Sequence, residues 1–262
     1  MIYNLGSFTI GLFKEIREVI RLLANILGWI VFGAFRGKPI HRQSVFYQMV
    51  FTGLRSVLIV FFVTVFTGIV LAMQTAYQLE KMGAVLYVAS LVAVSLCREL
   101  SPVLTALVVA GRVGSAFAAE LGTMKVSEQI EALETMAINP VRFLVVPRFI
   151  ALFIMLPCLT VLGNISGILG GYLVGTQSLN INSDLYIQTT FKYLEIKDIY
   201  TGIMKSFVFA IVIALIGCYE GLNTKGGAEG VGRATTRSVV ISFILIILAD
   251  CVLTTIFYFS KV

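Results

Sequence analysis

The sequence predicts an all-α polytopic membrane protein, and two observations support this fold class. Of its 262 residues, 58% are hydrophobic and only 13% are charged, and the mean hydropathy is +0.94. Soluble domains average about 45–50% apolar and about 25% charged residues. Apolar runs also recur along the chain, and a spanning helix needs about 20 mostly apolar residues. The chain therefore has room for about five spans and their connections, and for no separate soluble domain.

Residues 1–44 are expected to form an interfacial helix followed by a basic turn. Within 8–34, apolar residues recur at helical spacing, and charged residues such as Lys14 and Arg17 occupy the opposite face. This pattern is typical of a helix lying in the membrane plane, with Trp29 at headgroup level. An amphipathic helix on a soluble core would show the same pattern, but the composition disfavours that alternative. The basic turn comprises Arg36, Lys38, Pro39 and Arg42.

Residues 45–262 are expected to form one transmembrane permease domain. The predicted spans are residues 46–76, 84–112, 146–175, 199–219 and 238–259. A glycine-rich connection is expected over 221–237, and a polar outer loop between the third and fourth spans. Lys and Arg residues are concentrated before the first span and after the second and fourth. The positive-inside rule then places the N-terminus in the cytoplasm and the C-terminus outside.

A charged amphipathic segment, residues 119–137, separates the second and third spans. Its charged residues are Glu120, Lys125, Glu128, Glu131 and Glu134. In a chain this apolar, a polar helix between two spans is expected to lie outside the bilayer. We interpret it as a cytoplasmic docking helix that receives force from a soluble partner and passes it to the spans on either side.

Arg98 and Glu99 fall near the middle of the second predicted span, and Lys205 lies a turn or two into the fourth. A central Arg or Lys costs about 2.5–3.5 kcal/mol on insertion scales, so such residues usually face a partner or a cavity. One interpretation is an ion pair between neighbouring helices. The other is a polar patch that binds an anionic headgroup, with Leu71, Met73 and Tyr77 as walls for acyl chains. Asp250 is also intramembrane, and the sequence assigns it no role.

Small residues repeat every four positions in the third span, at Gly163, Gly167, Gly171 and Gly175. Small residues let membrane helices approach closely, either within one subunit or at a homodimer interface. Both interpretations stay open.

The sequence contains no phosphate-binding GxxxxGK[ST] loop and no nucleophile with a neighbouring base. Its four cysteines and single histidine have no metal-ligand spacing. We therefore expect no enzymatic activity, no metal, no cofactor and no nucleic-acid partner. Any energy for transport is expected to come from another chain.

Two long segments carry a family resemblance. Residues 98–148 read RELSPVLTALVVAGRVGSAFAAELGTMKVSEQIEALETMAINPVRFLVVPR, and residues 218–240 read CYEGLNTKGGAEGVGRATTRSVV. Both resemble signatures of the MlaE (YrbE-type) permeases, the membrane subunits of ABC transporters that work with MCE proteins. The resemblance places the family's coupling helix on Glu120–Met136, including Ser127 and Gln129. It also places Arg98, Glu99 and Lys205 in a lipid cavity.

The resemblance implies a homodimeric permease in the bacterial inner membrane, with cytoplasmic ABC ATPase subunits and a periplasmic MCE-domain protein. It implies phospholipid movement between the inner membrane and the outer envelope, and so a role in outer-membrane lipid asymmetry. Two alternatives are an ATP-independent channel or secondary transporter, and a membrane scaffold for a periplasmic complex. The first leaves the polar docking helix unexplained, and the second would tolerate loss of the intramembrane charges.

Overall fold

A computed structural model describes residues 2–35 and 42–259. Over these residues the protein is helical and contains no strand. Five helical runs are long and apolar enough to cross a membrane: Arg42–Glu80, Val85–Val126, Val141–Gln177, Ile196–Leu222 and Gly227–Phe259. The predicted all-α polytopic fold class is therefore confirmed. Of the predicted basic turn, Arg36, Lys38 and Pro39 lie outside the described residues.

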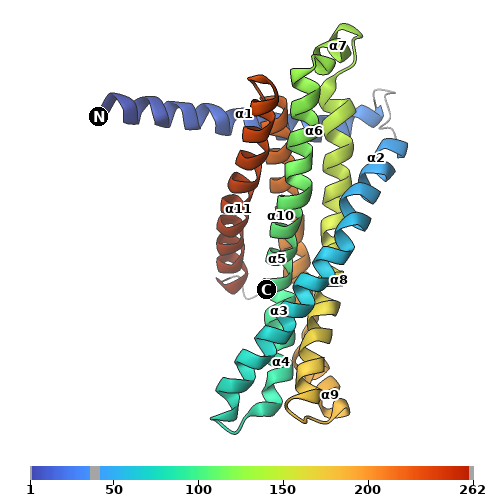
Figure 1. Ribbon diagram of the computed structural model, residues 1–262, viewed down its shortest axis with the longest axis vertical. Helices are drawn as coiled ribbons and strands as arrows, with labels where there is room; N and C mark the ends of the chain where they lie inside the picture. The colour runs from blue at the N-terminus through green and yellow to red at the C-terminus, as the bar shows by residue number, and fades with distance from the viewer. Residues whose placement is uncertain (1, 36–41, 260–262) are drawn as a thin grey trace.

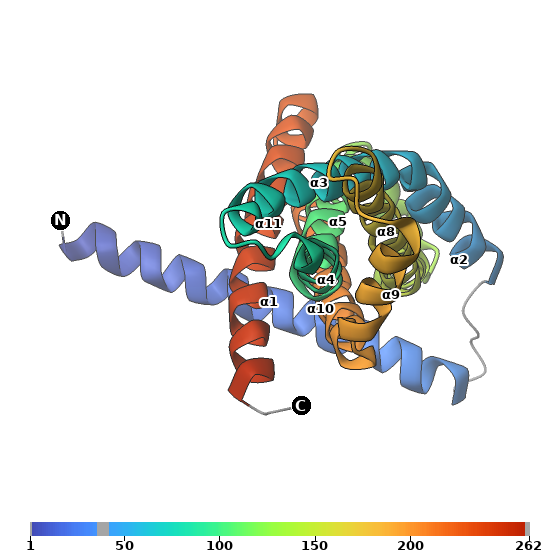
Figure 2. The same ribbon diagram turned by 90° about the horizontal axis from the view of Figure 1, so that it is seen from below.

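Helix α1 (Ile2–Phe35) lies crosswise over one end of the bundle, and its N-terminal part extends beyond it (Figures 1 and 2). Leu22 and Ile26 are buried in the main core, whereas Phe13, Ile16 and Ile20 are exposed. The apolar residues of this helix are thus divided between a face on the bundle and a face with no partner in the described chain.

The first two spanning runs are interrupted by π-helical turns. The first contains α2 (Arg42–Met49), the π-helical turn η1 (Val50–Leu54) and α3 (Arg55–Glu80). The second contains η2 (Val85–Tyr87), α4 (Val88–Ser95), the π-helical turn η3 (Leu96–Leu100), α5 (Ser101–Val109), the π-helical turn η4 (Ala110–Gly114) and α6 (Ser115–Val126). Pro102 has no N–H for the carbonyl of Arg98, which removes one α-helical hydrogen bond at η3.

The third run, η5 (Val141–Val145) and α8 (Val146–Gln177), packs closely against α3. A Cβ added at Gly68 would lie 2.0 Å from the carbonyl oxygen of Gly167, and one at Gly170 would lie 2.2 Å from that of Val65. Backbone contact of this kind needs glycine. At Gly167 the small-residue repeat therefore serves packing within one subunit.

The predicted outer loop after α8 contains a helix, α9 (Ser183–Tyr193). The side chain of Asn182 accepts a hydrogen bond from the backbone N–H of Asp184 at 2.9 Å, which caps the helix start. Tyr186 is 2% exposed, and a Cβ at Gly175 would lie 2.3 Å from its ring. Burial of this aromatic ring holds α9 against the end of α8, opposite α1 (Figure 1).

The expected glycine-rich connection over 221–237 is mostly helical, so that prediction is wrong for most of its length. Helix α10 (Ile196–Leu222) and helix α11 (Gly227–Phe259) are separated only by residues 223–226. Glycine lowers helix stability by about 1 kcal/mol relative to alanine, a cost that tertiary packing can override. Here Ala234 and Ser238 are buried, and Ser238 donates a hydrogen bond to the carbonyl of Gly114 at 3.4 Å.

Candidate functional site

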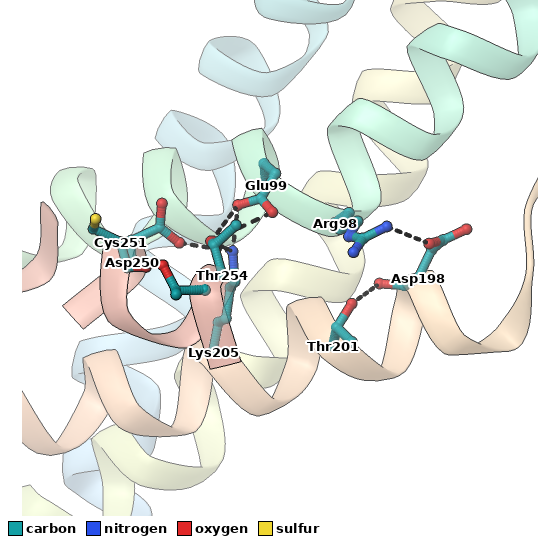
Figure 3. Close-up of polar contacts among 9 residues, drawn as sticks. Arg98, Glu99, Asp198, Thr201, Lys205, Asp250, Cys251 and Thr254 are labelled. Carbon is teal, nitrogen blue, oxygen red and sulfur yellow. Dashed lines mark hydrogen bonds and ion pairs between the residues drawn. The ribbon is translucent and has the colours of Figure 1, made fainter. Parts of the chain in front are cut away.

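The intramembrane charged residues meet around η3, where α10 and α11 pass beside it. Arg98 and Glu99 lie on η3, Lys205 on α10, and Asp250 on α11. Figure 3 shows two separate groups, one around Lys205 and one joining Arg98 to Asp198.

Lys205 is the centre of the first group, and its side chain is 1% exposed. Its ammonium forms an ion pair with the Glu99 carboxylate and lies 2.8 Å from Oδ1 of Asp250. It also donates to Oγ1 of Thr254 at 2.7 Å, and Thr254 in turn donates to Oε2 of Glu99 at 3.2 Å. The contact between Lys205 and Asp250 is an ion pair and not a hydrogen bond. Three helical segments are therefore joined through one buried cation.

The second group is looser and more exposed. Nη1 of Arg98 lies 3.8 Å from Oδ1 of Asp198, with side chains 34% and 10% exposed, respectively. Asp198 has a second role at the start of α10, where its Oδ2 accepts from the backbone N–H of Glu195 at 3.3 Å. Asp198 is thus held by helix capping as well as by Arg98.

The local sequence explains why α10 comes so close to η3. A Cβ at Gly202 would lie 2.1 Å from the carbonyl oxygen of Cys97, so only glycine fits there. Asp198 and Lys205 are seven residues apart, about two helical turns, and therefore share the face of α10 on which Gly202 lies. The glycine brings both charged residues to the two charged residues of η3.

The structure pairs Glu99 with Lys205 and places Arg98 in the neighbouring group with Asp198, and the three predicted acyl-chain residues belong to neither group. Leu71 is half-buried and packs against a core cluster that includes Ala72, Val92 and Leu96. Met73 and Tyr77 are 54% and 66% exposed on α3, and the ring of Tyr77 lies 4.2 Å from Nζ of Lys81.

Sequence reasoning missed two acidic partners and Thr254. Asp250 was seen as intramembrane but had no assigned role, and Asp198 was placed in an outer loop. A signal was present for Asp250, because a second intramembrane charge of opposite sign pairs naturally with Lys205. For Asp198, the signal was its spacing of two helical turns from Lys205.

The charged segment 119–137 is not one helix. Helix α6 continues to Val126, and a break at Ser127 and Glu128 precedes the short helix α7 (Gln129–Thr135). Glu128 has a φ of +58°, the left-handed conformation that ends one helix and turns the chain into the next. Helix α7 forms one tip of the molecule, on the side where α1 lies (Figure 1).

Ion pairs inside the chain occupy some of the predicted coupling residues. Glu120 binds Nη2 of Arg148 at 2.7 Å and so joins α6 to α8. Lys125 binds Glu131 across the break, and this hydrogen bond lowers the pKa of the Glu131 carboxyl. Ser127 donates to the carbonyl of Thr123 at 2.8 Å.

The remaining predicted coupling residues are exposed. Glu128, Gln129 and Glu134 are exposed, whereas Ile130 is 4% exposed and fixes α7 to the bundle. Met136 is 62% exposed beside them. An open groove of ≈ 550 Å³ lies where α7 meets α6 and α8, lined by Ala119, Glu120, Thr123, Met124, Gln129 and Arg148. Acidic and apolar groups are therefore presented together around a groove.

Within the described residues, no group of three or more His, Cys, Asp or Glu side chains could hold a metal ion. The described polar groups around η3 instead form ion pairs and hydrogen bonds within the chain.

Comparison with known proteins extends over most of the chain. The family described as Permease MlaE matches residues 45–256. A probable ABC transporter permease protein of Rickettsia typhi is 43% identical over 87% of this chain and 88% of its own length. The intermembrane phospholipid transport system permease protein MlaE of Haemophilus influenzae is 37% identical over 96% of this chain and 98% of its own. The chloroplastic protein TRIGALACTOSYLDIACYLGLYCEROL 1 of Arabidopsis thaliana is 37% identical over 89% of this chain and 66% of its own.

Proposed function

This chain belongs to the MlaE permease family of ABC transporter permeases, and from that premise we propose that it moves phospholipid between the inner membrane and the outer envelope. A separate ATPase would supply the energy. The observation that carries the proposal is the family match over residues 45–256, which includes both η3 and α7. The similarity to a phospholipid transport permease of Haemophilus influenzae supports the substrate class.

The proposed ATPase contact is the α6–α7 segment. Glu128, Gln129 and Glu134 are exposed there, and the groove beside α7 could receive a side chain of a partner. Lys125, Glu131 and Glu120 have a different role in the proposal. Their ion pairs connect α7 to α6, and α6 to α8, so a displacement of α7 is passed to two spans.

The proposed lipid contact is the η3 region, with Arg98 as the headgroup ligand. Arg98 is 34% exposed and its acidic partner is 3.8 Å away, so a phosphate can replace or join that partner. Lys205 is 1% exposed and already bound to two carboxylates, so it positions Glu99 near the headgroup. Leu71, Met73 and Tyr77 would contact acyl chains, with the cavity completed by a second copy of the chain.

The proposed orientation places the α1 and α7 end in the cytoplasm and the α9 end on the envelope side, where an MCE-domain protein would bind. Helices α1 and α7 lie at one end of the molecule and α9 at the other (Figure 1). The positive-inside bias along the sequence supports this assignment.

The docking role is tested by reversing charge on α7. In the double variant Glu128→Lys and Glu134→Lys, we expect loss of ATPase co-purification and of ATP-dependent phospholipid transfer in reconstituted membranes. Glu80→Lys, a charge reversal at another exposed glutamate at the end of α3, is the control and should retain both. Full ATPase binding and transfer by the double variant would exclude α7 as the docking element.

The lipid contact is tested with a photoactivatable phospholipid. We expect Arg98→Ala to reduce crosslinking to η3 and to slow transfer, whereas the control Lys225→Ala, at an exposed position between α10 and α11, changes neither. Unaltered crosslinking and transfer in Arg98→Ala would leave only a structural ion pair between Arg98 and Asp198.

A further inference from the structure

The charged residues of α1 are sorted by sign between two of its faces. Its acidic residues are turned toward the bundle. Nη2 of Arg237 donates to both carboxylate oxygens of Glu15, at 2.7 and 2.8 Å, and the Tyr219 hydroxyl donates to Oε2 of Glu18 at 3.0 Å. In contrast, Lys14, Arg17 and Arg21 are exposed, and none of them has an ion-pair partner in the described chain.

The apolar residues of α1 are divided in the same way. Leu22 and Ile26 are buried against the bundle. Phe13, Ile16 and Ile20 are 72%, 47% and 59% exposed, and the helical repeat places them on one face. The helix therefore has a bundle face, an unpartnered apolar face and a basic row formed by Lys14, Arg17 and Arg21.

The basic row and the apolar face meet in an open groove. The groove has a volume of ≈ 580 Å³ and is lined by Phe13, Lys14, Ile16, Arg17 and Ile20. Its lining thus combines aliphatic and aromatic groups with two cations, and no acidic side chain lines its described part. This is the chemistry of a site for a negatively charged headgroup with its upper acyl chain beside it.

We propose that α1 is a binding site for anionic phospholipid in the leaflet at the α7 end of the bundle. The basic row attracts the headgroup, and the exposed apolar face contacts the acyl chains. A zwitterionic headgroup brings its own ammonium toward the row and is bound less strongly. The acidic residues that would otherwise neutralise the row are turned toward the bundle and bound there.

The contacts of the acidic residues also fix the rotation of α1 about its axis. Arg237 binds Glu15, and its Nε lies 3.4 Å from Oε1 of Glu220. These contacts tie α1 to the end of α10 and the start of α11. The basic row is therefore held outward, and lipid bound to it is connected to the α10–α11 junction.

The proposal is tested in nanodiscs with the full chain and a single tryptophan reporter. The chain has one tryptophan, so Trp29→Phe with Phe13→Trp places the only tryptophan beside the groove. Two samples have the same mixture of anionic and zwitterionic phospholipid. In one sample the anionic lipid carries brominated acyl chains, and in the other the zwitterionic lipid carries them. At equal bromine content, we expect the brominated anionic lipid to quench the tryptophan fluorescence about twofold more strongly than the brominated zwitterionic lipid. Equal quenching by the two labels would overturn the proposal.

Variants of the row separate charge from structure. Lys14→Gln, Arg17→Gln and Arg21→Gln together should abolish the difference between labels, while Lys14→Arg, Arg17→Lys and Arg21→Lys should preserve it. The control Lys81→Gln, Lys192→Gln and Lys197→Gln, at the other end of the molecule, should also preserve it. A preference for the anionic label that survives the neutral variant would overturn the proposal, as would loss of the preference in the charge-conserving variant.

Discussion

Lys205 and Glu134 each carry one charge, but the structure surrounds them differently. Lys205 is 1% exposed and contacts Glu99, Asp250 and Thr254 on two other helical segments. Glu134 is exposed and has no ion-pair partner among the described residues. The first belongs to the group around η3 within the spans, and the second to the α6–α7 segment at the tip.

The difference follows from the surroundings of the two regions. A charge among apolar helices must be paired within the chain, because no water is present to solvate it. A charge at the tip is hydrated and needs no internal partner, so it remains available to another molecule. The internal ion pairs around Lys205 thus hold three helical segments together, whereas Glu134 stays free of any ion pair within the described residues.

The largest effect is expected at Lys205. Lys205→Ala leaves two carboxylates facing each other without a cation, and loss of one partner of a buried ion pair costs about 3–5 kcal/mol. Thermal unfolding in detergent would show this loss. The combination Lys205→Met, Glu99→Gln and Asp250→Asn removes all three charges and should recover part of the stability. An unchanged melting temperature for Lys205→Ala would contradict the stabilising role assigned to the ion pairs of Lys205 with Glu99 and Asp250.

A smaller effect is expected at Arg98. Asp198 keeps its hydrogen bond from the N–H of Glu195 when Arg98 is removed, and Arg98 itself is partly exposed. Arg98→Ala should therefore lower stability by about 1 kcal/mol. The same unfolding measurement applies, with Arg98→Lys as the charge-conserving control. A loss as large as that of Lys205→Ala would show that the two groups around η3 are equally structural.

No measurable stability change is expected for Glu134→Ala, because the side chain is hydrated and unpaired. Its neighbour Ile130 is 4% exposed, so Ile130→Ala is the matched control and should cost about 2–4 kcal/mol. A marked destabilisation by Glu134→Ala would mean that α7 uses its acidic residues for its own fold.

The ion pair across the α6–α7 break predicts a change in a pKa. The hydrogen bond from Lys125 lowers the pKa of Glu131, so Lys125→Met should raise that pKa toward the ordinary value of 4.5. Because the folded-state pKa is the lower one, the pair stabilises the fold above the unfolded pKa. That contribution is lost as the pH falls through the folded pKa. Carboxyl NMR titration measures the shift, and Lys81→Met is a distant control that should leave Glu131 unaffected.

Hydrophobicity and charge order along the chain were enough to predict five spans and a polar segment between the second and third. These are properties of consecutive residues, since a span needs length and low charge. The prediction was less accurate where packing decides local structure. Residues 228–237 are helical despite their glycines, because Ala234 and Ser238 pack into the bundle. Glu128 breaks the predicted docking helix through a backbone conformation that its residue type does not specify.

The sequence by itself determined the class of protein, the number of spans and the identity of the intramembrane charged residues. Only the tertiary structure decided which of those charges pair. Glu99, Lys205 and Asp250 come from three segments far apart in the chain, and their contact depends on the close approach of α10 to η3 at Gly202. Pairing is a property of distance between helices, and hydropathy along a chain contains no information about that distance.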